Sequence, residues 1–476
     1  MDRTDVLIIG GGISGLSLAW QLSQRGIKTQ LWESAKRLGG KIKSDHHDGY
    51  ITEQSASVVL NYRPEVSRFL AESGLAKIME PRNRETAPNR YVLNNGSLIK
   101  LSSSLHQVLM SPLWSKAGRL RLLAECMISR GGGADETVSQ FIRRRFGDEL
   151  LDKAIEPFVA GILASDPDKA NAWSVLPRMT ALERRFGRVS VGVLAHKLLH
   201  RRTASVREIF SFKGGMSSLV DGISDRLATS DTFTLRTDCC AQQLVQSGNG
   251  WLVSGETAAG DQSVQTRQVV LCTPAAVSSN LLKPLDARLS KLLAGIEYAA
   301  MSLVHLGFDR SDISHPLDGT GFLTPRAADL SFTGNLWLSS TFSKRAPPDK
   351  ALMTCYMGGS RNPHVASWDN QRMIDTALSD LGGVLGIRAA PEMTRIVRHR
   401  QALPLYHGAY FQRCQAISEQ VTAHPGLHLL ANYLDGVSVR DRLANSLDTA
   451  CMITEALKIQ KCTKQVTGGI GIAQQI

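Results

Sequence analysis

The stretch "VLIIGGGISGLSLAWQLSQRGIKTQLWE" (Val6–Glu33) decides the fold of this chain. It begins with a short apolar run that predicts a buried strand, and Gly10, Gly12 and Gly15 follow in the spacing G-x-G-x-x-G. The first glycine permits a tight turn, the second lets the backbone approach a pyrophosphate, and the third lets the next helix pack closely on the strand. We therefore expect a nucleotide site whose phosphates lie at the helix N-terminus, beside Ile13 and Ser14.

The end of the same stretch narrows the choice of nucleotide. Apolar residues recur at helical spacing after Gly15, Gly26 ends the helix, and Lys28–Trp32 predicts a second strand. Glu33 and Ser34 follow that strand, at the place where a carboxylate accepts hydrogen bonds from the ribose hydroxyls. An acidic side chain there disfavours a 2′-phosphate, so NADP is not expected, while NAD and FAD both remain.

Length and composition describe a globular protein. The 476 residues are enough for two or three domains, and 43% of them are hydrophobic. No apolar run approaches the roughly 18 residues that a membrane span needs. The eight cysteines show no C-x-x-C pairing, which predicts reduced thiols, with neither a zinc site nor a disulfide framework. The first predicted strand begins near the N-terminus, so we expect a cytoplasmic protein without a targeting segment.

The basic charge is unevenly distributed. The net charge is +12, and Arg184–Arg207 contains seven basic residues and no acidic residue. Such a run is compatible with a solvated helix face, with an anionic membrane surface, or with the entrance for an anionic substrate. We expect no nucleic-acid partner, because aromatic residues make up only 6% of the chain and no nucleic-acid motif is present.

The stretch "ESAKRLGGKIKS" (Glu33–Ser44) resembles the signature E-x-x-x-R-x-G-G-R/K-x-x-[ST] of the flavin amine oxidase superfamily. The resemblance implies FAD rather than NAD as the cofactor. It also implies that Arg37, Gly39 and Gly40 run along the pyrophosphate and that Lys41 occupies the usual basic position.

The pattern along the chain predicts a discontinuous cofactor domain. Residues 101–207 carry helical but not strand signals, and the sequence around 275–424 mixes strands with helices. The expected ranges are 1–84, 208–274 and 425–462 for the FAD-binding domain, 85–100 and 275–424 for a substrate domain, 101–207 for a helical domain, and 463–476 for a loose tail.

Further stretches resemble the FAD-dependent, oxygen-using protoporphyrinogen oxidases, especially "EPFVAGILASDP", "VHLGFD" and "STFSKRAP". The resemblance covers nearly the whole chain. It implies an α/β fold in which a Rossmann-like FAD-binding domain of the flavin amine oxidase type accompanies a mixed-sheet substrate domain and an all-helical membrane-binding domain. It implies oxygen-dependent oxidation of protoporphyrinogen IX to protoporphyrin IX in haem biosynthesis, by hydride transfer to FAD with release of hydrogen peroxide. We therefore expect peripheral attachment to the cytoplasmic membrane face; a homodimer is one option.

The resemblance also assigns residues to the site. Val437, Ser438 and Val439 are implied to lie at the flavin ring, and the backbone of Ala241 at the adenine. Arg90 is implied to pair with a substrate propionate. The residues implied to surround the tetrapyrrole are Gly161, Leu336, Trp337 and Tyr356.

The departures from the family pattern gather beside the reacting carbon. Ser55, Ala56 and Ser57 stand where the family usually has G-P-N, and His399 stands in place of a tryptophan near the flavin. Ala431 and Tyr410 replace a glycine and a histidine. Three alternatives therefore stay open: oxidation of coproporphyrinogen, oxidation of another pyrrolic or amine substrate by a paralogous flavin oxidase, and a flavoprotein without catalysis.

Overall fold

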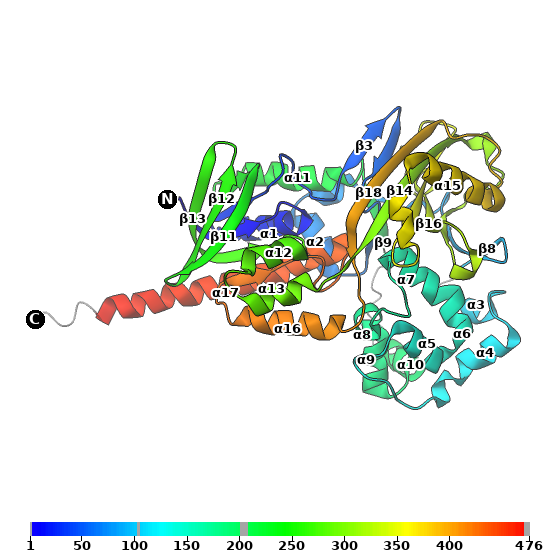
Figure 1. The fold of residues 1–476 in the computed structure, drawn as a ribbon, viewed down its shortest axis with the longest axis horizontal. Helices are drawn as coiled ribbons and strands as arrows, with labels where there is room; N and C mark the ends of the chain where they lie inside the picture. Colours follow the sequence, from blue (N-terminus) through cyan, green and yellow to red (C-terminus); the bar gives the residue numbers. More distant parts are fainter. Residues whose placement is uncertain (1, 102–104, 200–207, 471–476) are drawn as a thin grey trace, which may run out of the picture.

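The computed structural model describes residues 2–101, 105–199 and 208–470. Two seven-stranded sheets and a lobe of helices make up the molecule (Figure 1). The first sheet lies on the left of the view with the long helix α17, the second at the upper right, and the helical lobe at the lower right.

The first sheet is built around β1, whose residues Val6–Ile9 are all buried. Because side chains alternate along a strand, Val6 and Ile8 pack on one face, while Leu7 and Ile9 pack on the other. Its strands are β1 (Asp2–Ile9), β2 (Thr29–Trp32), β10 (Phe233–Arg236), β11 (Cys239–Ser247), β12 (Gly250–Thr257), β13 (Gly260–Leu271) and β19 (Leu427–Leu429). The parallel pairs β1–β2 and β1–β13 place the carboxyl ends of these strands at one edge, as nucleotide-binding sheets require.

Helices cover both faces of the first sheet. The face of Val6 and Ile8 carries α1 (Ile13–Ser23), α2 (Pro64–Glu72), α11 (Ser217–Ala228) and α17 (Val439–Ile470). The face of Leu7 and Ile9 carries α12 (Ala275–Leu282), α13 (Ala287–Ala294) and α16 (Tyr410–Thr422). Helix α17 extends to Ile470, so the described part of the expected loose tail is helical, and residues 471–476 lie outside the described chain.

The second sheet has the order β18-β14-β17-β16-β15-β7-β8. Its strands are β7 (Asn89–Asn94), β8 (Ser97–Lys100), β14 (Tyr298–Asp309), β15 (Gly319–Leu323), β16 (Phe332–Trp337), β17 (Lys350–Gly358) and β18 (Met393–Pro404). The outer face packs Met353, Cys355 and Met357 of β17 against α15 (Asn370–Leu385). The alternate residues of β17, which include Thr354 and Tyr356, lie on the inner face of the second sheet, the face toward the Ser55–Ser57 loop.

Small elements connect the two sheets. They are the hairpin β3 (Ser44–His47) and β4 (Tyr50–Glu53), the sheet of β5 (Val59–Asn61), β6 (Met79–Pro81) and β9 (Glu208–Phe212), and the short helix α14 (Leu338–Thr341). The loop between β4 and β5 contains Ser55–Ser57 and runs along the boundary between the cofactor half and the second sheet.

The helical lobe consists of α3 (Leu105–Met110), α4 (Lys116–Leu123), α5 (Val138–Phe146), α6 (Asp148–Leu150), α7 (Glu156–Leu163), α8 (Ala172–Val175), α9 (Pro177–Phe186) and α10 (Val189–Leu199). A buried ion pair holds it together: Arg145 is 3.2 Å from Glu125 and 2.6 Å from Glu183. Glu125 also accepts hydrogen bonds from the first amides of α10. Within residues 2–101, 105–199 and 208–470, no helix combines the length and the apolar character that crossing a bilayer requires.

A candidate dinucleotide and substrate site

The glycine turn after β1 has the geometry that a pyrophosphate needs. Gly10 has φ +109°, and a Cβ there would lie 2.8 Å from the Cys272 carbonyl oxygen. A Cβ at Gly15 would overlap the Gly10 carbonyl oxygen. At Gly12, the N-cap of α1, no heavy atom of the described residues lies within 4 Å of the Cβ position. The backbone is therefore closed on the protein side and open where a phosphate would meet the amides of Ile13 and Ser14.

Glu33 lies directly behind this turn. Its carboxylate accepts hydrogen bonds from the Gly11 amide at 2.7 Å and from the Ala35 amide at 2.8 Å, and the Ser34 hydroxyl lies 3.3 Å from it. A carboxylate has about four acceptor positions, so it keeps capacity for ribose hydroxyls. The Cys239 amide donates to the Glu33 carbonyl at 2.9 Å, which brings the start of β11, and with it Ala241, to the same end of the site.

The second glycine pair contacts the first motif. The Gly39 amide donates to the Gly11 carbonyl at 2.8 Å, and a Cβ at Gly40 would lie 3.3 Å from the Gly12 Cα. Arg37 holds this loop from within, because its guanidinium donates to the carbonyls of Leu38, Gly40 and Ile42. The structure thus brings together two motifs that are about thirty residues apart.

Lys41 extends from this loop to the second sheet. Its ammonium donates to the carbonyl oxygens of Gln401 and Ala402 in β18, the latter at 2.7 Å. Although much of the residue is exposed, protein atoms surround the ammonium, and this desolvation lowers the pKa of Lys41 to about 8. Lys41 is therefore a cation that links the cofactor loop to the substrate side.

The loop Ser55–Ser57 is held by side chains from several elements. The Ser55 hydroxyl donates to the Lys41 carbonyl at 2.8 Å. Ala56 packs against the core on the face of the first sheet that carries Val6 and Ile8. The Ser57 carbonyl accepts from the Ser211 hydroxyl at 3.0 Å, and His399 Nε2 lies 2.5 Å from the Gln54 carbonyl. A carbonyl oxygen can only accept, so Nε2 of His399 carries the proton.

A buried ion pair supports this loop. Arg345 donates to Glu53 at 2.9 Å and to the Ser211 hydroxyl at 2.8 Å, and both charged side chains are almost fully buried. Burial raises the pKa of Glu53, against the opposing effects of Ser44 and Arg345. The chain Glu53–Arg345–Ser211–Ser57 therefore fixes the backbone next to the altered residues.

The N-terminus of α17 completes the cofactor side. Ser438 precedes the helix, its hydroxyl donates to Asp441 at 2.6 Å, and the Asp441 amide donates back to it at 3.2 Å. Arg440 donates to the Leu60 carbonyl at 2.7 Å, which ties the helix start to β5 just after the Ser55–Ser57 loop. Val437, Ser438 and Val439 thus lie at a helix N-terminus that can stabilise negative charge nearby.

Tyr356 and an apolar cluster lie beyond this loop. The Tyr356 hydroxyl is 3.5 Å from the Ser57 hydroxyl, and burial raises the pKa of the phenol. Tyr356 packs in one cluster with Ala164 at the end of α7, Met301 of β14 and Leu403 of β18. This cluster forms an apolar wall at the edge of the cofactor loop.

The other predicted substrate residues divide between the two faces of the second sheet. Leu336 pairs with Thr354 and shares the inner face with Tyr356, and Gly161 lets α7 approach that face because a Cβ there would lie 2.5 Å from Leu323 Cδ2. Arg90 is exposed on β7, and by strand alternation it shares the inner face with Val92 and Leu323.

Trp337 is the exception. It is fully buried on the outer face, where its ring packs against Tyr91, His315 and Phe322. Successive residues of a strand point to opposite faces, so Trp337 and Leu336 cannot both line one pocket. The structure therefore does not bring Trp337 to the inner face with Leu336 and Tyr356.

Sequence reasoning missed the residues that act through long-range contacts. Met301, Leu403 and Ala164 join Tyr356 only after folding, and the partner of Glu53 is Arg345, 292 positions away. "STFSKRAP" contained Arg345 as a familiar stretch, but nothing local in it indicates a partner in β4.

The family model described as flavin containing amine oxidoreductase matches residues 13–443. A mitochondrial protoporphyrinogen oxidase of Nicotiana tabacum is 28% identical, covering 95% of each chain, and a coproporphyrinogen III oxidase of Bacillus subtilis (strain 168) is 25% identical, covering 92% of this chain and 95% of the relative.

Solved structures share the fold. A crystal structure from Exiguobacterium sp. 255-15, provisionally assigned as a protoporphyrinogen oxidase, superposes with a TM-score of 0.77 at 23% identity over 96% of this chain and 99% of that chain. A putrescine oxidase double mutant superposes with a TM-score of 0.69 at 17% identity, over 95% and 99% of the two chains.

Proposed function

This chain belongs to the flavin-containing amine oxidoreductase family, and we propose that it oxidises protoporphyrinogen IX to protoporphyrin IX in haem biosynthesis with FAD as its cofactor. The family makes it an FAD-dependent oxidoreductase. The protoporphyrinogen and coproporphyrinogen oxidases of plants and bacteria, which match almost the whole chain, support a porphyrinogen as the substrate.

The open side of the Gly12 turn is the observation that supports FAD binding. The amides of Ile13 and Ser14 would meet the pyrophosphate, Glu33 would accept the ribose hydroxyls, and the backbone of Ala241 would meet the adenine. The flavin ring would then lie between the Ser55–Ser57 loop and the start of α17. Both regions are joined to each other through Arg440 and Leu60.

Oxidation of a porphyrinogen requires correct positioning of the substrate more than it requires a strong base. A porphyrinogen consists of electron-rich pyrroles joined by methylene bridges. FAD, when bound, would supply the acceptor for a hydride from such a bridge, with oxygen as the final acceptor and hydrogen peroxide as its product. Three such two-electron oxidations, each also releasing a proton, convert the porphyrinogen to the porphyrin. The residues of this chain would orient the macrocycle and place a bridge carbon beside the cofactor loop.

The inner face of the second sheet suits this substrate in size and polarity. Tyr356, Ala164, Met301 and Leu403 offer an apolar surface for the macrocycle. Arg90 lies on the same face of β7, three strand positions from β17. Val92 is the residue of β7 level with Tyr356, and Arg90 lies two residues further along the strand. With neighbouring strands about 4.8 Å apart, the two backbones are roughly 16 Å apart, a distance that the long Arg90 side chain and a propionate arm would span together. The fork of Arg90 suits a carboxylate.

Coproporphyrinogen is the second candidate, because its oxidases also match the chain over most of its length. It carries four propionates and needs more cations around the ring. The cluster at Tyr356 is apolar, and Lys41 beside it already donates to two backbone carbonyls. This distribution favours the substrate with two carboxylates.

The positions of two tyrosines disfavour an amine substrate, whose oxidases commonly place aromatic residues in front of the flavin. Tyr406 and Tyr410 are both buried in the core, with ring centroids 4.9 Å apart, and the Tyr410 hydroxyl donates to the Tyr433 carbonyl at 2.6 Å. Their rings therefore serve packing rather than an open cage for an amine.

We further propose that the helical lobe attaches the protein peripherally to the cytoplasmic face of an anionic membrane. Leu120, Leu123 and Met127 are 68%, 58% and 74% exposed, and Leu194 of α10 is 58% exposed. A basic residue near an anionic surface contributes about 1 kcal/mol, and Arg184, Arg185 and Arg188 are exposed close to α10. Arg201, Arg202 and Arg207, from the same basic run, lie outside the described residues.

The substrate is tested by mixing the FAD-loaded protein with freshly reduced protoporphyrinogen IX in air and following porphyrin fluorescence against a control without enzyme. Coproporphyrinogen III and a series of amines are run in parallel. Faster porphyrin formation from protoporphyrinogen supports the proposal. Faster oxidation of coproporphyrinogen assigns the alternative substrate, and hydrogen peroxide from amines alone contradicts both.

A further inference from the structure

One short connector fastens both ends of helix α7. It follows β17 and contains Ser360 and Arg361. The Ser360 amide donates to the carbonyl of Ala164, just past the last residue of α7, at 2.8 Å. The Arg361 guanidinium donates to the carboxylate of Glu156, the first residue of α7, at 3.1 Å. The position of the helix on the second sheet thus depends on two adjacent residues.

Arg361 connects this helix to two strands of the sheet. Its guanidinium also donates to the Thr324 carbonyl at 2.7 Å, the Thr324 hydroxyl at 2.9 Å and the Phe332 carbonyl at 3.2 Å. Thr324 follows β15, and Phe332 begins β16. The side chains of Arg361 and Glu156 are each only 6% exposed, so water cannot readily replace these contacts.

Helix α7 is packed against the proposed substrate surface with little spare room. At Gly161 a Cβ would lie 2.5 Å from Leu323 Cδ2 and 3.0 Å from the Thr333 carbonyl oxygen. At the end of the helix, Ala164 packs in the cluster of Tyr356 and Met301. A displacement of α7 would therefore change the space in front of Tyr356.

We propose that Arg361 is a positioning residue that sets the width of the substrate pocket by holding α7 at a fixed distance from the inner face of the second sheet. Arg361 lies outside the apolar cluster and acts through Glu156 and α7. This inference rests on the proposed function, because the pocket in question is the one that would hold the tetrapyrrole.

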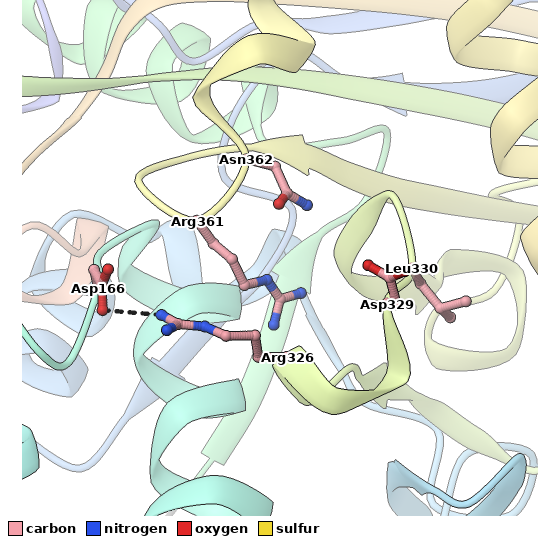
Figure 2. Close-up of a pocket in the computed structure, with 6 residues that line it drawn as sticks. All are labelled: Asp166, Arg326, Asp329, Leu330, Arg361 and Asn362. Atoms are coloured by element: carbon pink, nitrogen blue, oxygen red, sulfur yellow. Dashed lines mark hydrogen bonds and ion pairs between the residues drawn. The ribbon is translucent and has the colours of Figure 1, made fainter.

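A second arginine in the same place provides the matched control. Arg326 and Arg361 both line a pocket of about 270 Å³, together with Asp166, Asp329, Leu330 and Asn362 (Figure 2). The Arg326 side chain is 50% exposed, and it pairs with Asp166 at 3.0 Å, with Asp168 at 3.5 Å and, more weakly, with Glu156 at 3.9 Å. The Arg326 amide donates to Glu156 at 2.9 Å, a contact that a side-chain substitution retains.

The two arginines should differ because of burial. Ion pairs at an exposed side chain contribute little, since water and salt replace them. Removal of Arg361 takes away the buried partner of Glu156 and leaves this carboxylate with the Arg326 amide and with the half-exposed Arg326 guanidinium 3.9 Å away. Glu156 would then move toward water and take the start of α7 with it.

The test compares Arg361→Gln with Arg326→Gln in the FAD-loaded protein. Hydrogen exchange of the α7 amides measures the helix directly and needs no substrate. We expect faster exchange across residues 156–164 only in Arg361→Gln. We also expect the KM for protoporphyrinogen IX to rise roughly tenfold or more in that variant, with a smaller fall in kcat, and Arg326→Gln to stay close to the wild type.

Arg361→Lys is the second variant, which keeps the charge and loses the planar fork. Intermediate exchange and an intermediate KM support the proposal even if Arg361→Gln does not fold. Equal behaviour of Arg326→Gln and Arg361→Gln, or a lysine variant identical to the wild type in both measurements, overturns it. If the wild type does not oxidise any porphyrinogen, the proposed function fails, while the exchange data still decide whether Arg361 holds α7.

Discussion

The glycine turn after β1 and the inner face of the second sheet are built in opposite ways. The turn is made by backbone contacts of Gly10, Gly12, Gly15 and Gly39, most of them within the first forty residues and one with the Cys272 carbonyl just past the end of the neighbouring strand. The inner face is made by side chains such as Ser57, Ala164 and Tyr356, which come from distant parts of the chain. A backbone site demands particular residues at particular positions, whereas a side-chain surface can be rebuilt with other residues. Among the departures from the family pattern, Ser55–Ser57 and His399 fall beside the second region, whereas Tyr410 and Ala431 pack in the core on one face of the first sheet.

The largest effect that separates the two regions is expected for Gly15→Ala. The added Cβ would overlap the Gly10 carbonyl oxygen, which is a backbone atom that cannot move without opening the turn. We expect a loss of several kcal/mol in the free energy of unfolding, about 3 kcal/mol or more, together with loss of FAD. Denaturant unfolding of the apoprotein measures it. A variant as stable as the wild type would show that this turn is not close-packed.

Gly12→Ala sharpens the comparison because the same methyl group meets open space. Gly12 has φ −71°, which alanine adopts readily, and no heavy atom of the described residues lies within 4 Å of its Cβ position. We expect an apoprotein of nearly unchanged stability and an affinity for FAD that falls by roughly tenfold or more, or about 1.4 kcal/mol. Titration of the apoprotein with FAD measures the affinity. Full affinity would contradict the placement of the pyrophosphate at Gly12.

Arg90→Ala tests the inner face. The proposed contact with a propionate is made equally in the ground state and in the transition state, so its loss should raise the KM more than it lowers kcat. We expect a rise in KM of roughly tenfold, typical of a lost charge-assisted pair. Steady-state kinetics with protoporphyrinogen IX provide both constants. An unchanged KM would remove Arg90 from the substrate site while leaving the cofactor half intact.

The smallest effect is expected at Lys41, where the two regions meet. Desolvation lowers the pKa of Lys41 from 10.5 to about 8 in the folded protein, so the unfolded chain binds more protons between these values. The contribution of Lys41 to the free energy of unfolding therefore rises as the pH increases from about 8 to 10.5. Over the same pH range, Lys41 loses its positive charge beside the pyrophosphate site. We expect the affinity of the apoprotein for FAD to weaken as the pH rises through about 8.

Lys41→Arg is the control for this titration, because a guanidinium keeps its charge over the same range. Its affinity for FAD should vary less with pH than that of the wild type. Identical pH profiles for the two proteins would show that Lys41 does not act on the cofactor through its charge.

The sequence predicted the backbone site well, since the strand, the glycine spacing and the terminal acid at Glu33 are local signals. The sequence does not show which of two adjacent residues in a strand faces the site when both residues are apolar. Leu336 and Trp337 were therefore assigned to one pocket, and the register of β16 against β17 separates them. Nor could it join Glu53 to Arg345, or Glu156 to Arg361, because the energy of such pairs arises only when burial brings them together.

Anaerobic mixing of the FAD-loaded protein with protoporphyrinogen IX tests the central claim most directly. Without oxygen, electrons taken from the substrate must stay on the flavin, so each flavin can accept only two of the six electrons and the absorbance of oxidised flavin should fall once. Admission of air should restore that absorbance and let the remaining oxidations proceed to the porphyrin. That result would establish a porphyrinogen as the electron donor to the cofactor in this site. A flavin that remains oxidised in the presence of the porphyrinogen would contradict the account.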